Sequence, residues 1–493
     1  GLRPVNTMEP WGEYVAGLFR MGFGGIGLVT IALGTVFPFL MKAVERTADA
    51  PGRTLGRLLA INTAGAIAGA LLSGFVLLPS LGMWGSMRFL SAAYLVAGLL
   101  LPFGLGHSGI VIRAVGIGSL ALLFSALDPT RLPTHWNPPF QENPDRVLKT
   151  WEGADCTVAV VEKRNGHRAI KINGAYALGS TAAYQEQANQ SRIPLHVFPE
   201  TGSICYIGMG TGMSAGAALA PKFPKVERLV SCELTPAVVE AARTYIPEEL
   251  TRGLFTDPRS TVLVEDGRHY IMAGDEKFDM INADLFLPYR RGAGSLYSLD
   301  HYQAAAERLN PDGVFVQWLP LYQLTEFEFG VIARTMLEAF DQVTMWRNNF
   351  TPGKEKVALI GQKSATPLLP PPAGDREAMR AAVEGMEWFE ASPEMVRVEA
   401  DSIMFFYCGN LSAARDLFDS YPINTDDRPV IEYETPRTFR QRAEQEEMVF
   451  FVGPELARVT RQLLLACPVT EDPALQGHPA SSQRLVLAGA AFH

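Results

Sequence analysis

The sequence has few cysteines and no spacing that would pair them. Five cysteines occur among 493 residues and none forms a CxxC pair. Two of the five fall within stretches that we predict to be buried strands. This pattern argues against a disulfide framework and against a zinc site, so we expect no metal.

Clusters of basic residues are missing from the part of the chain that follows residue 128. The formal net charge of the whole chain is −9. Proteins that bind nucleic acid usually carry a concentrated basic surface, so nucleic acid is not an expected partner. The chain opens on Gly1 with no positively charged leader and cleavage site before its first apolar stretch, and we expect a processed or truncated form of something longer.

Charge is also missing from long stretches near the N-terminus. Met21–Met41, Leu58–Met87 and Phe89–Gly106 contain no charged residue, and in Ser108–Leu127 only Arg113 is charged. The first two are each long enough to cross a bilayer core of about 30 Å. Buried helices of a large soluble protein are the alternative, but such helices rarely lack a charged face over this length. Residues 1–127 are therefore predicted to form three or four transmembrane helices.

Four basic residues lie between the first two apolar stretches, and the positive-inside rule places this loop in the cytoplasm: Lys42, Arg46, Arg53 and Arg57. Three spans would leave the rest of the chain in the cytoplasm, whereas four would leave it outside. Because the ligand inferred below is a cytosolic metabolite, we expect Ser108–Leu127 to lie along the interface or re-enter. The prediction is a multi-pass membrane protein whose larger, charged part lies in the cytoplasm, with the lipid bilayer as a partner.

Four further regions follow the apolar segment. Residues 128–146 are rich in proline and are predicted to be a linker, and residues 147–202 a small β unit with a hairpin at Asn165-Gly166. In residues 203–363 short apolar strands alternate with helical stretches, which predicts a doubly wound, Rossmann-like sheet of seven strands ending in an antiparallel pair. Residues 364–493 are predicted to be a helical C-terminal extension and tail.

The ends of the first two predicted strands carry residues suited to a nucleoside. Gly208, Gly210 and Gly212 follow the first strand, and their missing side chains would let a ligand approach the backbone. Glu233 ends the second strand and could accept both hydrogen bonds of a ribose diol. A tight turn without ligand and a solvated acid are the alternatives. The pairing of glycine loop and acid favours the nucleoside site.

The third and fourth strands also end in acids. Asp266, followed by Gly267, could accept from the exocyclic amine of adenine or cap the next helix, and both roles could hold together. Asp284 could hold and deprotonate a nucleophile, or it could cap a loop. The GxGxG turn, the acids that continue onto the third and fourth strands, and the terminal antiparallel pair favour an adenosylmethionine-type site of the class I methyltransferase kind over a nicotinamide site.

The motifs IGMGTG, SCELTPAVVEAAR, EDGRHYI and FDMINAD, in this order, resemble the polyamine aminopropyltransferases, or spermidine synthases. Two further stretches resemble their membrane-fused bacterial relatives: GRLLAINTAGAIAGALLSGFVLLPSLG and the late NTDDRPVIEYETPR. The resemblance implies S-adenosylmethionine or its decarboxylated form as co-substrate, with no metal, and a multi-pass protein of a bacterial inner membrane with its catalytic domain in the cytoplasm. It also implies that the glycines line the nucleoside, Glu233 binds its ribose and Asp266 its adenine. Asp284 would orient the attacking amine and take its proton, and methylthioadenosine would be released.

Several positions depart from the family pattern. Thr211 stands in the glycine loop where the family usually has Asp, and Leu287 stands where it has a second acid. Ala177 replaces a usual Gln, and the usual acidic pair and Tyr are not recognisable in Ser180–Ser191. Those acids normally hold ammonium groups, and a buried ammonium without a partner is costly. We therefore expect Thr211 to admit intact adenosylmethionine, and a long polyamine to be a poor acceptor.

The reaction itself has alternatives. The nucleophile would be a small amine, or the donor's own amine or carboxylate in an intramolecular cyclisation. A methyltransferase on the same site would release adenosylhomocysteine instead. A nucleoside-sensing or transporting membrane protein is a third interpretation, although the apolar stretches hold almost no polar residues for a substrate path. A homodimer is a further expectation that the sequence does not test.

Overall fold

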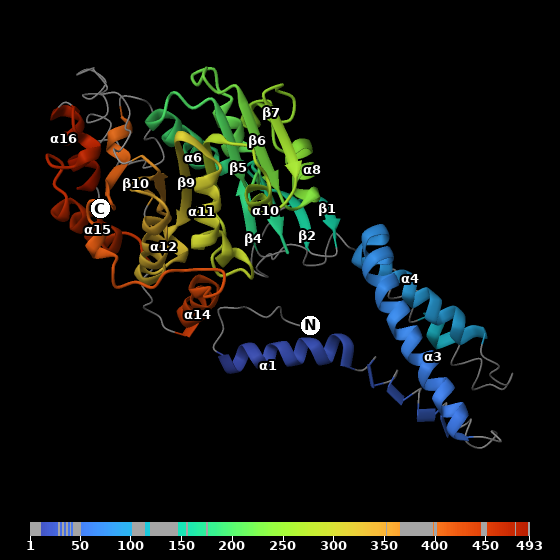
Figure 1. The fold of residues 1–493 in the computed structure, drawn as a ribbon. Coiled ribbons are helices and arrows are strands. Elements are labelled where there is room, and N and C mark those ends of the chain that lie inside the picture. Colours follow the sequence, from blue (N-terminus) through green and yellow to red (C-terminus); the bar gives the residue numbers. More distant parts are fainter. Residues whose placement is uncertain are drawn as a thin grey trace. The chain divides into compact units, whose positions relative to one another are not determined.

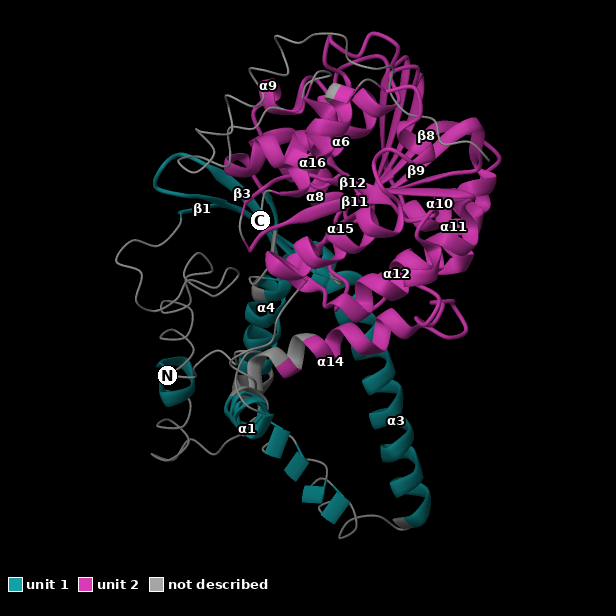
Figure 2. Ribbon diagram, turned by 90° about the vertical axis from the view of Figure 1, so that its left-hand side faces the viewer, with its two compact units in different colours: residues 1–179 teal, residues 180–493 magenta. Residues whose placement is uncertain are grey.

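The computed structural model describes most of the chain. The described residues are 11–27, 30–31, 34–35, 38–39, 41–42, 51–100, 114–118, 146–153, 156–173, 176–351, 353–364, 398, 402–444, 451–478 and 480–491. The predicted linker, apart from residue 146, lies outside them, as does most of the fourth apolar stretch. The chain divides into two compact units, residues 1–179 and residues 180–493, which are coloured separately in Figure 2.

The helices of the first unit are apolar and largely exposed. They are α1 (Trp11–Gly22), η1 (Phe23–Gly27), α3 (Pro51–Leu72), η2 (Ser73–Leu77) and α4 (Leu78–Leu100). Within the described ranges, one helical stretch, Gly52–Met83, is long and apolar enough to cross a membrane, and an 18-residue window in it has a mean hydropathy of 1.9. The structure thus offers one candidate span where the sequence predicts three or four. Parts of the other predicted spans lie outside the described residues.

A four-stranded antiparallel sheet completes the first unit. Its strands follow chain order: β1 (Arg146–Glu152), β2 (Thr157–Glu162), β3 (Arg168–Ile172) and β4 (Tyr176–Ser180). The predicted turn at Asn165-Gly166 joins β2 to β3, and Gly166 has a φ of +78°, which this tight turn requires. The sequence predicts a hairpin here, and the sheet is larger because β1 and β4 add to both sides.

The second unit is built on a mixed sheet of eight strands, in the order β12-β10-β11-β9-β8-β5-β6-β7. Strands β7, β6, β5, β8 and β9 run parallel, while β11, β10 and β12 add antiparallel pairings. The bounds are β5 (Ser203–Ile207), β6 (Arg228–Glu233), β7 (Ser260–Val264), β8 (Phe278–Ala283), β9 (Leu309–Pro320), β10 (Gln342–Arg347), β11 (Lys356–Gln362) and β12 (Tyr407–Asn410).

The prediction of seven strands was wrong by one. The eighth strand, β12, comes from the extension that was predicted to be helical, and it pairs with β10 through Thr344 and Asn410. Its four residues, YCGN, are too few to show a strand periodicity in the sequence. The predicted terminal antiparallel pair, β10 and β11, is confirmed.

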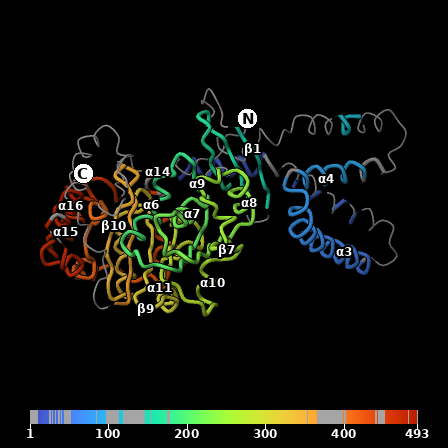
Figure 3. The backbone as a smooth tube through the Cα atoms, turned by 90° about the horizontal axis from the view of Figure 1, so that it is seen from above, coloured from blue at the N-terminus to red at the C-terminus, as the bar shows by residue number. Residues whose placement is uncertain are grey.

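Helices cover both faces of the large sheet. α10, α11, α12 and α14 contact one another in series, and α6, α7 and α9 form a second connected group. Helices α15 and α16 lie beside the β12 edge (Figures 1 and 3). The bounds are α6 (Tyr184–Val197), α7 (Met213–Ala218), α8 (Pro236–Tyr245), α9 (Glu248–Thr251), α10 (Gly267–Ala273), α11 (Leu299–Glu307), α12 (Glu326–Ala339), α14 (Val430–Glu444), α15 (Pro454–Ala466) and α16 (Ala480–Ala490). Short 3-10 turns are η3 (Thr181–Ala183), η4 (Ala293–Tyr297), η5 (Leu321–Gln323), η7 (Ile403–Phe406), η8 (Arg415–Leu417) and η9 (Pro473–Leu475).

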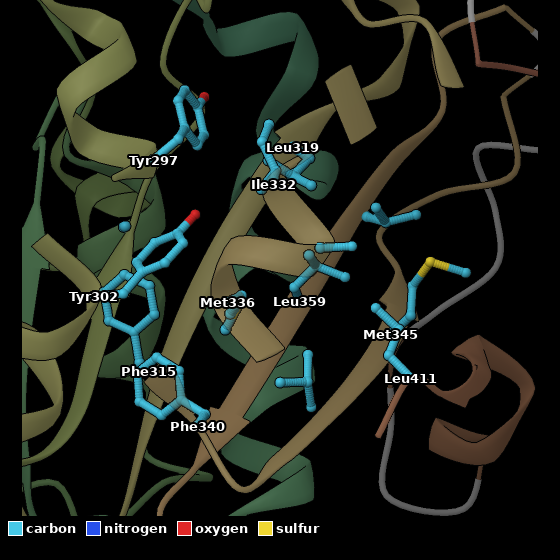
Figure 4. Close-up of a cluster of buried hydrophobic side chains, with 14 of the residues drawn as sticks. Tyr297, Tyr302, Phe315, Leu319, Ile332, Met336, Phe340, Met345, Leu359 and Leu411 are labelled. Atoms are coloured by element: carbon cyan, nitrogen blue, oxygen red, sulfur yellow. The ribbon is translucent and has the colours of Figure 1, made fainter. Parts of the chain in front are cut away.

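A column of aromatic rings packs α11 and α12 against the centre of the sheet (Figure 4). The ring centroids of Tyr302 and Phe315 are 5.4 Å apart, and those of Phe315 and Phe340 are 5.7 Å apart. All three side chains are buried, and aromatic side chains of this size contribute strongly to a core. This core fixes β9 and, through β9, the neighbouring β8, whose end carries Asp284.

Candidate active site

The predicted site residues meet at one edge of the large sheet. Ile207, the last residue of β5, is paired with Cys232 of β6 and with Ala283 of β8. The parallel register therefore brings the residues that follow these strands to the same level. The carboxyl ends of parallel strands are where ligands bind in doubly wound sheets.

The glycine loop adopts a backbone that favours glycine. Gly208, Gly210 and Gly212 have φ values of +87°, +56° and +78°. A Cβ atom on Gly208 would lie 3.3 Å from the ring of Phe286 and 3.5 Å from Cβ of Asp284. The absence of a side chain at Gly208 therefore keeps the glycine loop in direct contact with the end of β8.

Glu233 is nearly buried, with 7% of the residue exposed, and is held by the glycine loop. Its Oε2 accepts from Gly210 N at 3.1 Å, and its Oε1 accepts from Thr235 N at 3.0 Å. Burial raises the pKa of this carboxyl, and the hydrogen bonds from Thr235, Gly210 and Met209 partly offset that effect. A carboxylate oxygen can accept more than one hydrogen bond, so both oxygens keep capacity for a diol.

Asp266 caps α10, as one of its two predicted roles requires. Its Oδ1 accepts from Arg268 N at 2.8 Å and from His269 N at 3.3 Å. The residue is exposed, and its predicted contact with adenine stays a prediction. A Cβ atom on Gly267 would lie 2.8 Å from Cγ2 of Ile207, so close packing of α10 on β5 explains the glycine at this position.

Asp284 lies between the glycine loop and α6. Its Oδ1 accepts from Gln190 Nε2 at 2.8 Å and from Leu285 N at 2.7 Å, and within the described part of the chain no hydrogen bond reaches Oδ2. Loss of water around the carboxyl raises its pKa, while these two donors and the charge of Lys356 lower it. A carboxyl with one oxygen fixed, the other open and a raised pKa is suited to accept a proton.

Helix α6 supplies site residues that the sequence did not reveal. Gln190 orients Asp284, and Gln187, on the same face, accepts from Thr211 Oγ1 through Oε1 and donates to Ser180 O through Nε2 at 3.0 Å. Thr211 is 2% exposed, so this network around the middle of the glycine loop is buried and neutral. The signal was present as the polar run QEQANQS, whose members recur at helical spacing before an apolar stretch.

An ion pair lies next to this network. Glu186 of α6 pairs with Lys356, the first residue of β11, and the two side chains are 25% and 12% exposed. The usual acidic pair and Tyr of the family were not recognisable in Ser180–Ser191, and Glu186 is one acid within that segment. It is an acid, but its charge is compensated.

The loop after Asp284 is held by a distant part of the chain, which we call the clamp segment (residues 424–435). Glu432 accepts from Gly292 N at 2.6 Å and from Gly294 N at 3.0 Å, one bond to each oxygen. Thr435 Oγ1 donates to Pro288 O at 2.7 Å, and Asn424 Nδ2 donates to Gly294 O at 3.0 Å. The late NTDDRPVIEYETPR motif therefore restrains the loop at residues 285–298.

Comparison with known proteins gives a family for this part of the chain. Residues 191–351 match the model of the spermine/spermidine synthase domain. The polyamine aminopropyltransferase of Corynebacterium efficiens is 30% identical over 328 residues, which cover 63% of this chain and 61% of that protein. The polyamine aminopropyltransferase of Mycobacterium tuberculosis is 28% identical over 309 residues, covering 59% and 57%. The chain thus spans about three fifths of the length of these relatives.

Solved structures were also found. A spermidine synthase in complex with the transition-state analogue AdoDATO shares 22% identity over 44% of this chain and 73% of its own, with a TM-score of 0.38. A probable spermidine synthase from Corynebacterium glutamicum shares 16% identity over 58% and 97%, with a TM-score of 0.41. Scores at this level add nothing to the assignment, which rests on the domain match and the sequence relatives. Residues 191–351 of this chain are thus similar to the spermine/spermidine synthase domain, and the wider chain is similar to polyamine aminopropyltransferases.

Proposed function

We propose that this protein transfers the alkyl chain of an adenosylmethionine-type donor to an amine and releases methylthioadenosine. The observation that carries the proposal is the position of Asp284. Its carboxyl group has one oxygen fixed by Gln190 and Leu285, and it lies against Gly208 of the glycine loop. A proton acceptor is thereby held beside the place where a nucleoside would bind.

The donor would be held mainly by Glu233 and the backbone of the glycine loop. Glu233 is already oriented by two backbone N–H groups, so binding of a ribose diol requires little rearrangement. Leu234, which follows it, is 68% exposed, and Val264 at the end of β7 is 51% exposed. Val264 precedes Asp266 closely in the chain, and Leu234 follows Glu233, which pairs with Val264 across the two strands. Both apolar side chains would offer contact area to adenine.

The chemistry asks little of the protein beyond positioning and proton removal. The amine nitrogen forms a bond to the carbon beside the sulfonium while the carbon–sulfur bond breaks. The electron pair of that bond goes to sulfur, which leaves as the neutral thioether of methylthioadenosine. The proton lost by the amine passes to Asp284, whose raised pKa favours its acceptance.

We further propose that the donor is intact adenosylmethionine. Thr211 is hydrogen-bonded to Gln187, and both side chains are neutral, so the middle of the glycine loop presents no negative charge from these two residues to the donor. The amino acid end of intact adenosylmethionine carries an ammonium and a carboxylate together. The neutral hydrogen-bond network of Thr211 and Gln187 accepts such a pair of opposite charges more readily than a lone ammonium. The exposed apolar stretch Gly52–Met83 supports the further proposal that the chain is anchored in a membrane.

Product analysis tests the proposed reaction. The full chain, purified in detergent, is incubated with adenosylmethionine or its decarboxylated form, each with and without a mixture of primary amines. Methylthioadenosine formed together with an alkylated amine, either an added amine or the cyclised donor, supports the proposed reaction. Adenosylhomocysteine alone would assign a methyltransferase, and donor binding without either product would assign a sensor. Each of these two results would overturn the proposal.

A further inference from the structure

The ion pair of Glu186 and Lys356 bears on which amine the site accepts. Glu186 precedes Gln190 by one helical turn on α6, and Gln190 donates directly to Asp284. Residues four apart lie on the same helix face, so Glu186 lies on the face of α6 that carries Gln190, and the charges of Glu186 and Asp284 both act on Tyr322. Lys356 is near enough that its charge lowers the pKa of Asp284.

Backbone contacts hold the pair in place from both partners. Asn348 Nδ2 donates to Glu186 O at 2.9 Å, and Asn348 N donates to Lys356 O at 2.8 Å. Asn189 Nδ2 in turn donates to Asn348 O at 3.1 Å. One buried asparagine therefore ties α6 to the start of β11, and the ion pair is a fixed part of the site.

Three further titratable groups bear on the pair. Burial, followed by the charges of Glu186, Tyr289 and Asp284, raises the pKa of Tyr322 to about 12, and burial also raises the pKa of Tyr289, so both tyrosines stay neutral near pH 7. Glu355, the nearest other carboxylate in sequence, is buried, and its Oε1 accepts from Gly453 N. Glu186 is the acid on the helix face that carries Gln190, and Lys356 already pairs with it.

We propose that Lys356 makes the acceptor subsite reject a second ammonium group, so that the acceptor is an amine whose far end carries no positive charge. The far ammonium of a diamine would either compete with Lys356 for Glu186 or stay buried without a partner. Both are unfavourable, and a built-in repulsive group is a common source of specificity. This inference rests on the proposed alkyl transfer, and it assigns the class of acceptor.

The test compares two amines of equal length, butylamine and putrescine, with the full chain and the donor that gives methylthioadenosine. We expect kcat/KM to be about tenfold or more higher for butylamine. Lys356→Met frees Glu186 and should raise kcat/KM for putrescine by about tenfold, and adding Glu186→Gln should abolish that gain. Lys354→Met, a charge loss at a nearby exposed residue, serves as the control and should change neither value.

The outcomes separate the inference from the proposed function. If the wild-type chain forms methylthioadenosine and prefers putrescine to butylamine, the inference is overturned and the alkyl transfer stands. The same holds if the donor alone gives methylthioadenosine and neither amine is consumed. Absence of methylthioadenosine in every arm would overturn the proposed function. If Lys356→Met does not fold, the Glu186→Gln variant alone decides. It leaves Lys356 without its acid and should lower kcat/KM for putrescine further. An unchanged or higher kcat/KM for putrescine would refute the inference.

Discussion

Replacement of Asp284 by Asn gives a sharp test of the proposed chemistry. Asn has the same shape, and its Oδ1 can keep the hydrogen bonds from Gln190 and Leu285. The open oxygen becomes an amide nitrogen, which cannot take a proton. Positioned general bases contribute about 10²- to 10⁴-fold to rate, so kcat should fall by that factor. Donor binding should change by less than about tenfold, or 1.4 kcal/mol.

The same change should not destabilise the fold. Burial raises the pKa of Asp284, so the folded state binds its proton more tightly than the unfolded state. Stability is therefore lost as pH rises through the interval between the unfolded and the folded pKa of this group. Asp284→Asn removes that loss, and its melting temperature at pH 7 should equal or exceed that of the wild type.

Asp279, in the same strand, provides a matched control. It accepts from Gly202 N, Ser203 N and Asn310 Nδ2, and these bonds lower its pKa although burial raises it. Asp279→Asn should therefore lower the melting temperature above acid pH and leave kcat nearly unchanged. Methylthioadenosine release measures kcat, and titration calorimetry measures donor binding. Thermal unfolding across pH measures the melting temperature. An Asp284→Asn protein that keeps more than a tenth of wild-type kcat would refute the assigned role.

Three further predictions concern other parts of the site. Glu233→Gln should raise the donor Kd measured by calorimetry about tenfold or more, because hydrogen bonds to a charged group contribute roughly 1.5 to 3 kcal/mol. An unchanged Kd would show that Glu233 does not bind the donor. Thr211→Asp should shift the ratio of kcat/KM values towards the decarboxylated donor, and an equal ratio before and after the change would contradict the argument from Gln187 and neutral charge. Glu432→Ala should lower kcat by about tenfold through a misplaced loop. Glu434→Ala, which removes only a half-buried acid paired with Arg437, is its control, and a kcat equal to that of the control would show that the clamp is dispensable.

The positions of the strand-end acids could be predicted because their signal is local, while their roles stay predictions. A glycine loop or an acid that follows a short apolar run is visible within a few residues, and parallel register does the rest. Gly208, Glu233 and Asp284 were found in this way, and the structure brings them to one edge.

The features that could not be predicted from the sequence depend on contacts between residues far apart in the chain. Glu186 and Lys356 are far apart in the chain, and neither position is unusual by itself. The role of Gln190 depends on the direction of one helix face against the end of β8. Strand β12 was missed because its pairing with β10, and not its composition, makes it a strand.

The clamp segment has a consequence for how the protein is made. The glycine loop, Glu233 and Asp284 are all synthesised before residue 285, but the partners of the following loop come only at residues 424–435. Synthesis proceeds from the N-terminus, so the parallel strands can form while the clamp is still missing. A chain that stopped after the matched domain at residue 351 would carry each residue proposed to bind the donor and would lack the groups that restrain the loop after Asp284. The candidate site is therefore the product of two steps of synthesis, in which the strand ends come first and the contacts that fix the neighbouring loop come last.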